Sequence, residues 1–211
     1  MSFKSGSVTT SPPVGDESWL GWFLSQEGNE FLCRVPSDYM MDKFNLCGLD
    51  TMVTNYTAAL NAILDSEYCL NNWVGEGTNV ESEWLYGLIH ARYIMTPGGI
   101  DAMRKKFDYG DFGICPRVYC RGQHVLPIGL SEEYNDSMVK IYCPRCLDIF
   151  DPPQASAMLA GCMFGTSFPQ MFFMELPSLR PQPPTETYVP RLYGFQVHKS
   201  ALHPPSEDMD S

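Results

Sequence analysis

The spacing of four cysteines constrains the fold of this chain more than any other feature. Four residues separate Cys115 from Cys120, two separate Cys143 from Cys146, and 22 lie between the two pairs. A hairpin-like excursion brings such pairs together, and four thiolates around one ion are typical of a tetrahedral structural zinc site. Four thiolates leave no coordination position for water or substrate. The expected zinc ion, one per chain, therefore holds structure and performs no chemistry.

Two other interpretations of these cysteines stay open on the residues alone. The four cysteines can be unrelated buried thiols, or they can bind iron in a rubredoxin-like site. A redox carrier of this size with a large helical half is unusual, however. The remaining four cysteines are isolated from one another and are expected to be core or loop residues. They are Cys33, Cys47, Cys69 and Cys162.

The pattern along the chain predicts an α+β fold with two unlike halves. Residues 1–15 are small and polar and are expected to form a disordered leader. An all-helical domain is predicted over 16–109, a small β-rich zinc-ribbon domain over 110–176, and an extended proline-rich tail over 177–211. Within the helical domain, helices are expected over 16–25, 37–44, 50–65, 80–95 and 99–110. Ser37 is expected to cap the second helix, and "TPGG" at 96–99 to separate the last two.

The tripeptide Asp111-Phe112-Gly113 matches the magnesium-binding motif of protein kinases. The chain has none of the other parts that phosphoryl transfer needs, namely a glycine-rich loop and the "VAIK", "HRD" and "APE" motifs. A turn in which Phe112 packs into the core is the better interpretation. His90, inside a predicted helix, is likewise expected to be a hydrogen-bonded structural residue, so no catalytic residue is assigned and an enzyme is not expected.

The charge of the chain limits its partners. The net charge is −11, and residues 1–100 hold 12 acidic and 4 basic side chains, which argues against nucleic-acid binding by this half. Arg117, Arg121 and Arg145 lie beside the cysteines and either offset the charge of a zinc-thiolate centre or form a nucleic-acid-binding face. Because there is neither an apolar run of about 20 residues nor a signal-peptide pattern, we expect no membrane contact and a location in cytoplasm and nucleus.

Several strings resemble the regulatory beta subunit of the protein kinase casein kinase 2. They are "DKFNLCGL", "LYGLIHARYIMT", "GDFGICPRVYC", "LPIGLS", "MVKIYCPRC", "FPQMFFM" and "VPRLYGFQVH". The resemblance runs from about Trp19 to His198 and implies a zinc-ribbon homodimer that docks two catalytic subunits, giving a heterotetramer that phosphorylates protein substrates. The alternative is a zinc-ribbon nucleic-acid-binding or transcription protein.

The resemblance also implies roles for individual residues. The four cysteines would be the zinc ligands, and Pro116, Val118 and Ile149 would lie at the dimer contact. In "RLYGF", Tyr193 and Phe195 would anchor the tail in a groove of the catalytic subunit, with Met171 as a supporting contact. On the residues alone, these two aromatic side chains could equally fold back onto their own domain.

Two family features are weaker here. The dense acidic loop of the family is reduced to five acids within residues 65–83, interrupted by glycines and Trp73, so control by basic effectors is not carried over. The leader lacks serines followed by acids, so autophosphorylation there is not carried over either. Ser206, which precedes Glu207 and Asp208, is a weak substitute.

Overall fold

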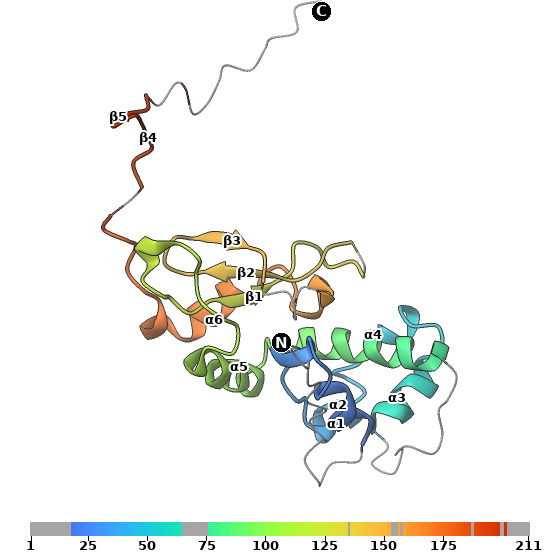
Figure 1. The fold of residues 1–211 in the computed structure, drawn as a ribbon. Helices are drawn as coiled ribbons and strands as arrows, with labels where there is room; N and C mark the ends of the chain where they lie inside the picture. The colour runs from blue at the N-terminus through green and yellow to red at the C-terminus, as the bar shows by residue number, and fades with distance from the viewer. Residues whose placement is uncertain are drawn as a thin grey trace, which may run out of the picture.

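The computed structural model describes residues 18–64, 76–134, 136–152, 156, 158–186, 188–198 and 201, with the backbone alone for 76–79. The predicted leader, residues 65–75 of the acidic segment, and Ser206 lie outside the described residues. Helices α1 to α5 gather on one side of a three-stranded sheet, α6 lies beside that sheet, and the tail leads away from both (Figure 1). No helix in the described part is long and apolar enough to cross a membrane.

The amino-terminal half is helical, as predicted, with three short helices followed by two longer ones. Gly28 and Gly48, each with positive φ, precede two 3-10 turns that interrupt the chain between helices. Ser18 caps the first helix by accepting a hydrogen bond from the Gly21 N–H. The elements are α1 (Trp19–Leu24), η1 (Asn29–Phe31), α2 (Ser37–Met41), η2 (Leu49–Thr51), α3 (Tyr56–Leu64), α4 (Glu76–Tyr93) and α5 (Pro97–Tyr109).

Two expected helix boundaries were wrong. Ser37 is the first residue of α2 rather than its cap, because Pro36 takes the extended capping position. The break predicted at "TPGG" lies between α4 and α5, but α5 begins at Pro97 and not at residue 99, with Thr96 as its cap and Pro97 in the first turn, where a missing N–H costs nothing. Only glycine fits at position 99, because a Cβ there would lie 2.0 Å from the carbonyl oxygen of Tyr93.

The carboxyl-terminal half, predicted to be β-rich, contains a three-stranded antiparallel sheet. Strands β1 (Leu126–Ile128), β2 (Lys140–Cys143) and β3 (Asp148–Phe150) pair in sequence order. Sequence analysis missed helix α6 (Phe168–Glu175), which packs against β1. Glycines before this segment and prolines after it masked a helical pattern in which Phe168 and Phe172 lie one turn apart and are fully buried.

One hydrophobic cluster joins the two halves. It runs from Trp19 in α1 through α4 and α5 to the sheet and Phe173 in α6. His90 in α4 bridges the halves as the predicted structural residue: Nε2 accepts from the Cys33 N–H at 3.1 Å, and Nδ1 lies 2.8 Å from the carbonyl oxygen of Met163. The domain division at residue 110 remains a prediction, since this core is continuous across it.

The kinase-like tripeptide is a turn, as expected. Phe112 is fully buried and packs edge-on against Phe31 at a centroid distance of 5.5 Å. Gly110 and Gly113 adopt positive φ on either side of it, and Asp111 pairs with Lys106. Asp111 therefore takes part in a surface ion pair, and Phe112 is part of the core.

Candidate metal centre

Two turns carry the four cysteines to one place. Cys115 precedes the 3-10 turn η3 (Val118–Cys120), and Cys120 ends it. Cys143 is the last residue of β2, and Cys146 lies in the turn that leads into β3. Both turns close through left-handed residues, Arg121 with φ of 53° and Leu147 with φ of 59°. The chain reversals that bring each cysteine pair together are thus set by local backbone geometry.

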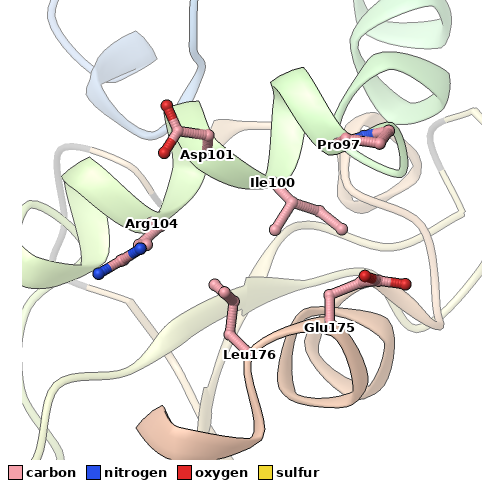
Figure 2. A pocket seen from close by; sticks show the side chains of 6 residues that line it. All are labelled: Pro97, Ile100, Asp101, Arg104, Glu175 and Leu176. Carbon is pink, nitrogen blue, oxygen red and sulfur yellow. The ribbon is translucent and has the colours of Figure 1, made fainter.

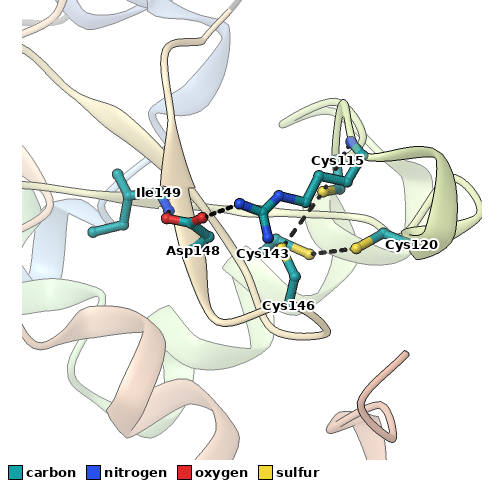
Figure 3. Close-up of polar contacts among 7 residues, drawn as sticks. Cys115, Cys120, Cys143, Cys146, Asp148 and Ile149 are labelled. Atoms are coloured by element: carbon teal, nitrogen blue, oxygen red, sulfur yellow. Dashed lines mark hydrogen bonds and ion pairs between the residues drawn. The ribbon is translucent and has the colours of Figure 1, made fainter. Parts of the chain in front are cut away.

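The geometry of the sulfur atoms suits a tetrahedral ion. All four Sγ atoms lie within 4.8 Å of one another. Cys115 Sγ is 3.8 Å from Cys146 Sγ, and Cys143 Sγ is 3.9 Å from Cys120 Sγ (Figure 3). A tetrahedral ion with metal–sulfur bonds of about 2.3 Å has sulfur–sulfur edges of about 3.8 Å. The four cysteines can therefore hold one metal ion, and unrelated buried thiols are not the arrangement observed.

The surroundings of the sulfurs favour binding of a cation. The Cys115, Cys120 and Cys143 side chains are buried, and Cys146 is half-buried. Burial raises the pKa of the Cys115 thiol above its usual range, so a bound cation is needed to hold it as the thiolate. The Arg117 N–H points at Cys115 Sγ from 3.5 Å, in the manner of a backbone donor to a metal-bound sulfur.

Two of the three arginines beside the cysteines lie close to carboxylates. Arg117 Nη2 lies 2.5 Å from Asp148 Oδ2, and the Arg117 guanidinium also lies over the Phe150 ring, 5.6 Å from its centroid. Arg121 is 4.0 Å from a carboxylate oxygen of Glu186. A nucleic-acid-binding face needs free cations, and two of its three candidate arginines face carboxylates instead.

Sequence reasoning missed Asp148 as the partner of Arg117. The only signal was an acid two residues after Cys146. The pairing depends on the β2–β3 register, in which Cys143 stands opposite Asp148. A register of this kind follows from the fold and not from local sequence.

The residues predicted at a dimer contact lie on the surface beside the cysteines. Pro116 is exposed, the Val118 side chain is 85% exposed, and Ile149 in β3 is 39% exposed. Val118 comes from the first cysteine turn and Ile149 from the strand that follows the second turn. The same local structure that gathers the thiols thus presents apolar side chains outward.

The tail contains a small hairpin that carries the two predicted docking residues. Strands β4 (Arg191–Leu192) and β5 (Phe195–Gln196) pair antiparallel around Tyr193 and Gly194. Both turn residues have positive φ, 50° and 88°, which is the two-residue turn that matches strand twist. Tyr193 is 94% exposed and Phe195 80% exposed. These side chains do not fold back onto the body of the protein.

Met171 does not join the hairpin in this structure. It lies on α6 and is partly buried, whereas β4 and β5 stand away from the body of the chain (Figure 1). A shallow hollow of about 160 Å³ lies between α5 and the end of α6, lined by Ile100 and Leu176 with charged residues at its rim (Figure 2). Two of those charges are already paired, Asp101 with Lys105 and Arg104 with Asp108. This hollow offers no convergent set of catalytic groups.

Comparison with known proteins agrees with the motifs. The model of the casein kinase II regulatory subunit family matches residues 18–196. The chain belongs to this family. Members of the casein kinase II regulatory subunit family are the non-catalytic partners of the kinase, so the chain is a regulatory subunit and not an enzyme.

Individual relatives cover nearly the whole chain. A Suppressor-of-stellate-like protein of Drosophila melanogaster is 51% identical over 199 residues, covering 94% of this chain and 87% of the relative. Casein kinase II subunit beta' of the same organism is 47% identical, covering 91% and 89%. Casein kinase II subunit beta of Schizosaccharomyces pombe is 46% identical, covering 90% and 84%. The similarity spans the helices, the cysteine turns and the hairpin together.

Proposed function

We propose that this chain dimerises through a zinc-bound cysteine centre and docks one casein kinase II catalytic subunit on each β4–β5 hairpin, stabilising the kinase and modulating its choice of protein substrates. The exposure of Tyr193 and Phe195 on a tight turn is the observation that carries this proposal. Interface hot spots are enriched in aromatic residues that become fully desolvated in a partner's pocket. Two such side chains held away from their own core are suited to that role.

The contribution of Phe195 to the binding free energy can be worked out from the exposure of its side chain. Burying a phenylalanine side chain contributes about 1.5–3 kcal/mol, and Phe195 is 80% exposed before binding. Nearly all of this contribution is therefore available to a partner. Because β4 and β5 contain two residues each, few other apolar contacts can compensate for its loss.

Calorimetric titration of the full-length, zinc-loaded chain with a casein kinase II catalytic subunit tests the docking role. Phe195→Ala should weaken binding by about 2 kcal/mol, roughly thirtyfold. Tyr188→Ala is the matched control, since Tyr188 is a 73% exposed aromatic residue of the same tail outside the hairpin. Equal affinities of the wild type and Phe195→Ala would refute docking through the hairpin.

We propose zinc as the ion because four thiolates in a tetrahedral arrangement match its preferred site. Metal analysis of the purified chain should give one zinc per chain, and a spectrum with iron–thiolate bands would contradict this. Cys143→Ser removes one ligand and should yield a chain without bound metal that is monomeric or aggregates. A well-folded, metal-free Cys143→Ser dimer would show that the site does not support the fold.

The proposed dimer contact consists of Pro116, Val118 and Ile149. Val118→Glu places a charge where an apolar contact is expected, and it should convert the dimer to a monomer in analytical ultracentrifugation while leaving zinc content unchanged. Val80→Glu is the matched control, because Val80 is 53% exposed on α4 in the helical half. Dimerisation of Val118→Glu with wild-type affinity would place the contact elsewhere.

A further inference from the structure

The turn after α2 presents an aromatic side chain that the proposed function does not use. Residues 41–48, here the Phe44 turn, connect α2 to η2. The Phe44 side chain is 85% exposed, as exposed as Val118 at the proposed dimer contact. Met41 in the same segment is 64% exposed. Single exposed apolar residues are common on protein surfaces. Whether Phe44 is suited to binding a partner therefore depends on the conformation of the turn that carries it.

Hydrogen bonds within the turn fix its backbone. The Phe44 N–H donates to Asp42 Oδ1 at 2.9 Å. The N–H groups of Asn45 and Cys47 bond to the carbonyl oxygens of Asp42 and Phe44. The Asn45 side chain donates to the carbonyl oxygen of Tyr39 at 3.1 Å. Because these bonds close the turn on both sides of Phe44, the side chain projects into solvent from an ordered backbone.

A long-range contact fastens the Phe44 turn to the core. Arg92 in α4 donates from Nη1 to the carbonyl oxygens of Asn45 and Cys47, each at 2.9 Å. Leu46 between them is 4% exposed and belongs to the hydrophobic cluster. The turn is thus held from α4 and from the core beneath it. An aromatic residue on so rigid a support loses little conformational entropy on binding a partner.

The charge around Phe44 indicates what kind of partner fits. Asp38, Asp42 and Asp50 are exposed along this stretch, against one exposed cation, Lys43. The half-buried Arg92 keeps its positive charge, because its carbonyl partners are neutral, so three exposed carboxylates are balanced by only two cations in this region. The surface therefore combines apolar side chains with an acidic rim, which complements apolar residues flanked by lysine or arginine.

We propose that the Phe44 turn is a docking surface for a basic amphipathic helix of a partner protein, with apolar residues on one face and lysine or arginine beside them. Helix α2, which leads into the turn, lies in the helical half, and the β4–β5 hairpin lies in the tail, away from the body of the protein (Figure 1). A protein bound at the Phe44 turn is a partner additional to the kinase. This inference does not depend on the hairpin docking role, and its test uses the chain without a kinase.

Fluorescence anisotropy with a synthetic probe tests the proposal. The probe is a short fluorescein-labelled peptide with leucines at helical i, i+4 spacing and lysines elsewhere, titrated with the full-length zinc-loaded chain. Phe44→Ala should weaken probe binding at least about tenfold. Because Phe44 is mostly exposed, this variant should melt at the wild-type temperature. Asp42→Asn keeps the oxygen that accepts from the Phe44 N–H but removes a charge, so binding should weaken severalfold and become less sensitive to salt.

Matched controls separate docking from general attraction of lysines to an acidic chain. Tyr109→Ala removes a side chain that is also 85% exposed, but at the end of α5, and it should change probe affinity less than about twofold. A second peptide with serine in place of leucine should bind much more weakly.

Three results would overturn the proposal. Phe44→Ala could bind the probe as tightly as the wild type, the serine peptide could bind as tightly as the leucine peptide, or Tyr109→Ala could lose as much affinity as Phe44→Ala. Analytical ultracentrifugation of Phe44→Ala measures, in addition, the size of the assembly that the chain forms. A smaller assembly than the wild type would show that a second copy of the chain covers this turn instead.

Discussion

Acidification should destabilise the fold through His90. This side chain is fully buried in α4. The Cys33 N–H can only donate, so Nε2 accepts, and the Met163 carbonyl oxygen can only accept, so Nδ1 carries the proton. A second proton on Nε2 would face the Cys33 N–H donor inside the core. Desolvation by burial accordingly lowers the pKa of His90 from its ordinary 6.5 to about 4.

The sign and size of the effect follow from linkage. The unfolded chain binds a proton at about pH 6.5, whereas the folded chain resists it until about pH 4. The stability associated with neutral His90 is therefore fully present above pH 6.5 and is lost as the pH falls from 6.5 to 4. One pKa unit corresponds to about 1.4 kcal/mol, so the loss reaches about 3 kcal/mol. That is a large part of the 5–15 kcal/mol typical of a folded domain.

Denaturant unfolding at about pH 7 and pH 4.5 measures this loss, with His90→Gln as the comparison. A glutamine amide can donate to the Met163 carbonyl and accept from the Cys33 N–H, but it does not titrate in this range. Loss of metal from the thiolates on acidification affects both proteins alike, so the difference between them isolates His90. The wild type should lose about 2–3 kcal/mol more than His90→Gln. Equal losses would refute the reasoning.

Three further predictions concern close packing, a buried hydroxyl and the hairpin. Gly129→Ala should lose more than about 2 kcal/mol in urea unfolding, because a Cβ there stands 2.3 Å from the backbone carbonyl oxygen of Gly161, which cannot move aside. Tyr86→Phe should lose about 1–3 kcal/mol by the same measurement, since the buried hydroxyl donates to one backbone oxygen at 2.7 Å and accepts from one N–H at 3.1 Å. Gly194→Ala should leave the unfolding midpoint unchanged, because nothing lies within 4 Å of the Cβ that alanine would add. It should weaken calorimetric binding of the catalytic subunit about tenfold, because the φ of 88° at this position is strained for alanine.

Sequence reasoning succeeded where the determining interactions are close together along the chain. The cysteine pairs predicted their own convergence, because each pair is brought together by a turn of only a few residues. Helical spacing predicted α4, and the change of pattern after residue 110 predicted the β-rich region that contains β2. The turn at Phe112 was also predicted, since glycines flank it on both sides. In each case the signal and the structure share the same few residues.

Prediction failed where tertiary contacts decide. Helix α6 was missed because its pattern is short, and its stability comes from burial of Phe168 and Phe172 against the sheet. The Arg117–Asp148 pair requires the β2–β3 register. Contacts between segments distant in sequence leave little trace in either segment alone.

The two proposed docking sites of this chain are supported in different ways, and their binding should differ accordingly. Arg92 and the buried Leu46 hold the Phe44 turn against the core, so its conformation is as stable as the fold. The β4–β5 hairpin has two residues in each strand and a side-chain bond from Arg191 to the Gly194 carbonyl oxygen, and hairpins of this size are marginal alone. A partner at the hairpin must offset the entropy of ordering it, whereas a partner at the Phe44 turn meets a surface already in place. Mutations that stiffen the backbone should therefore change affinity at the hairpin and leave affinity at the Phe44 turn unchanged.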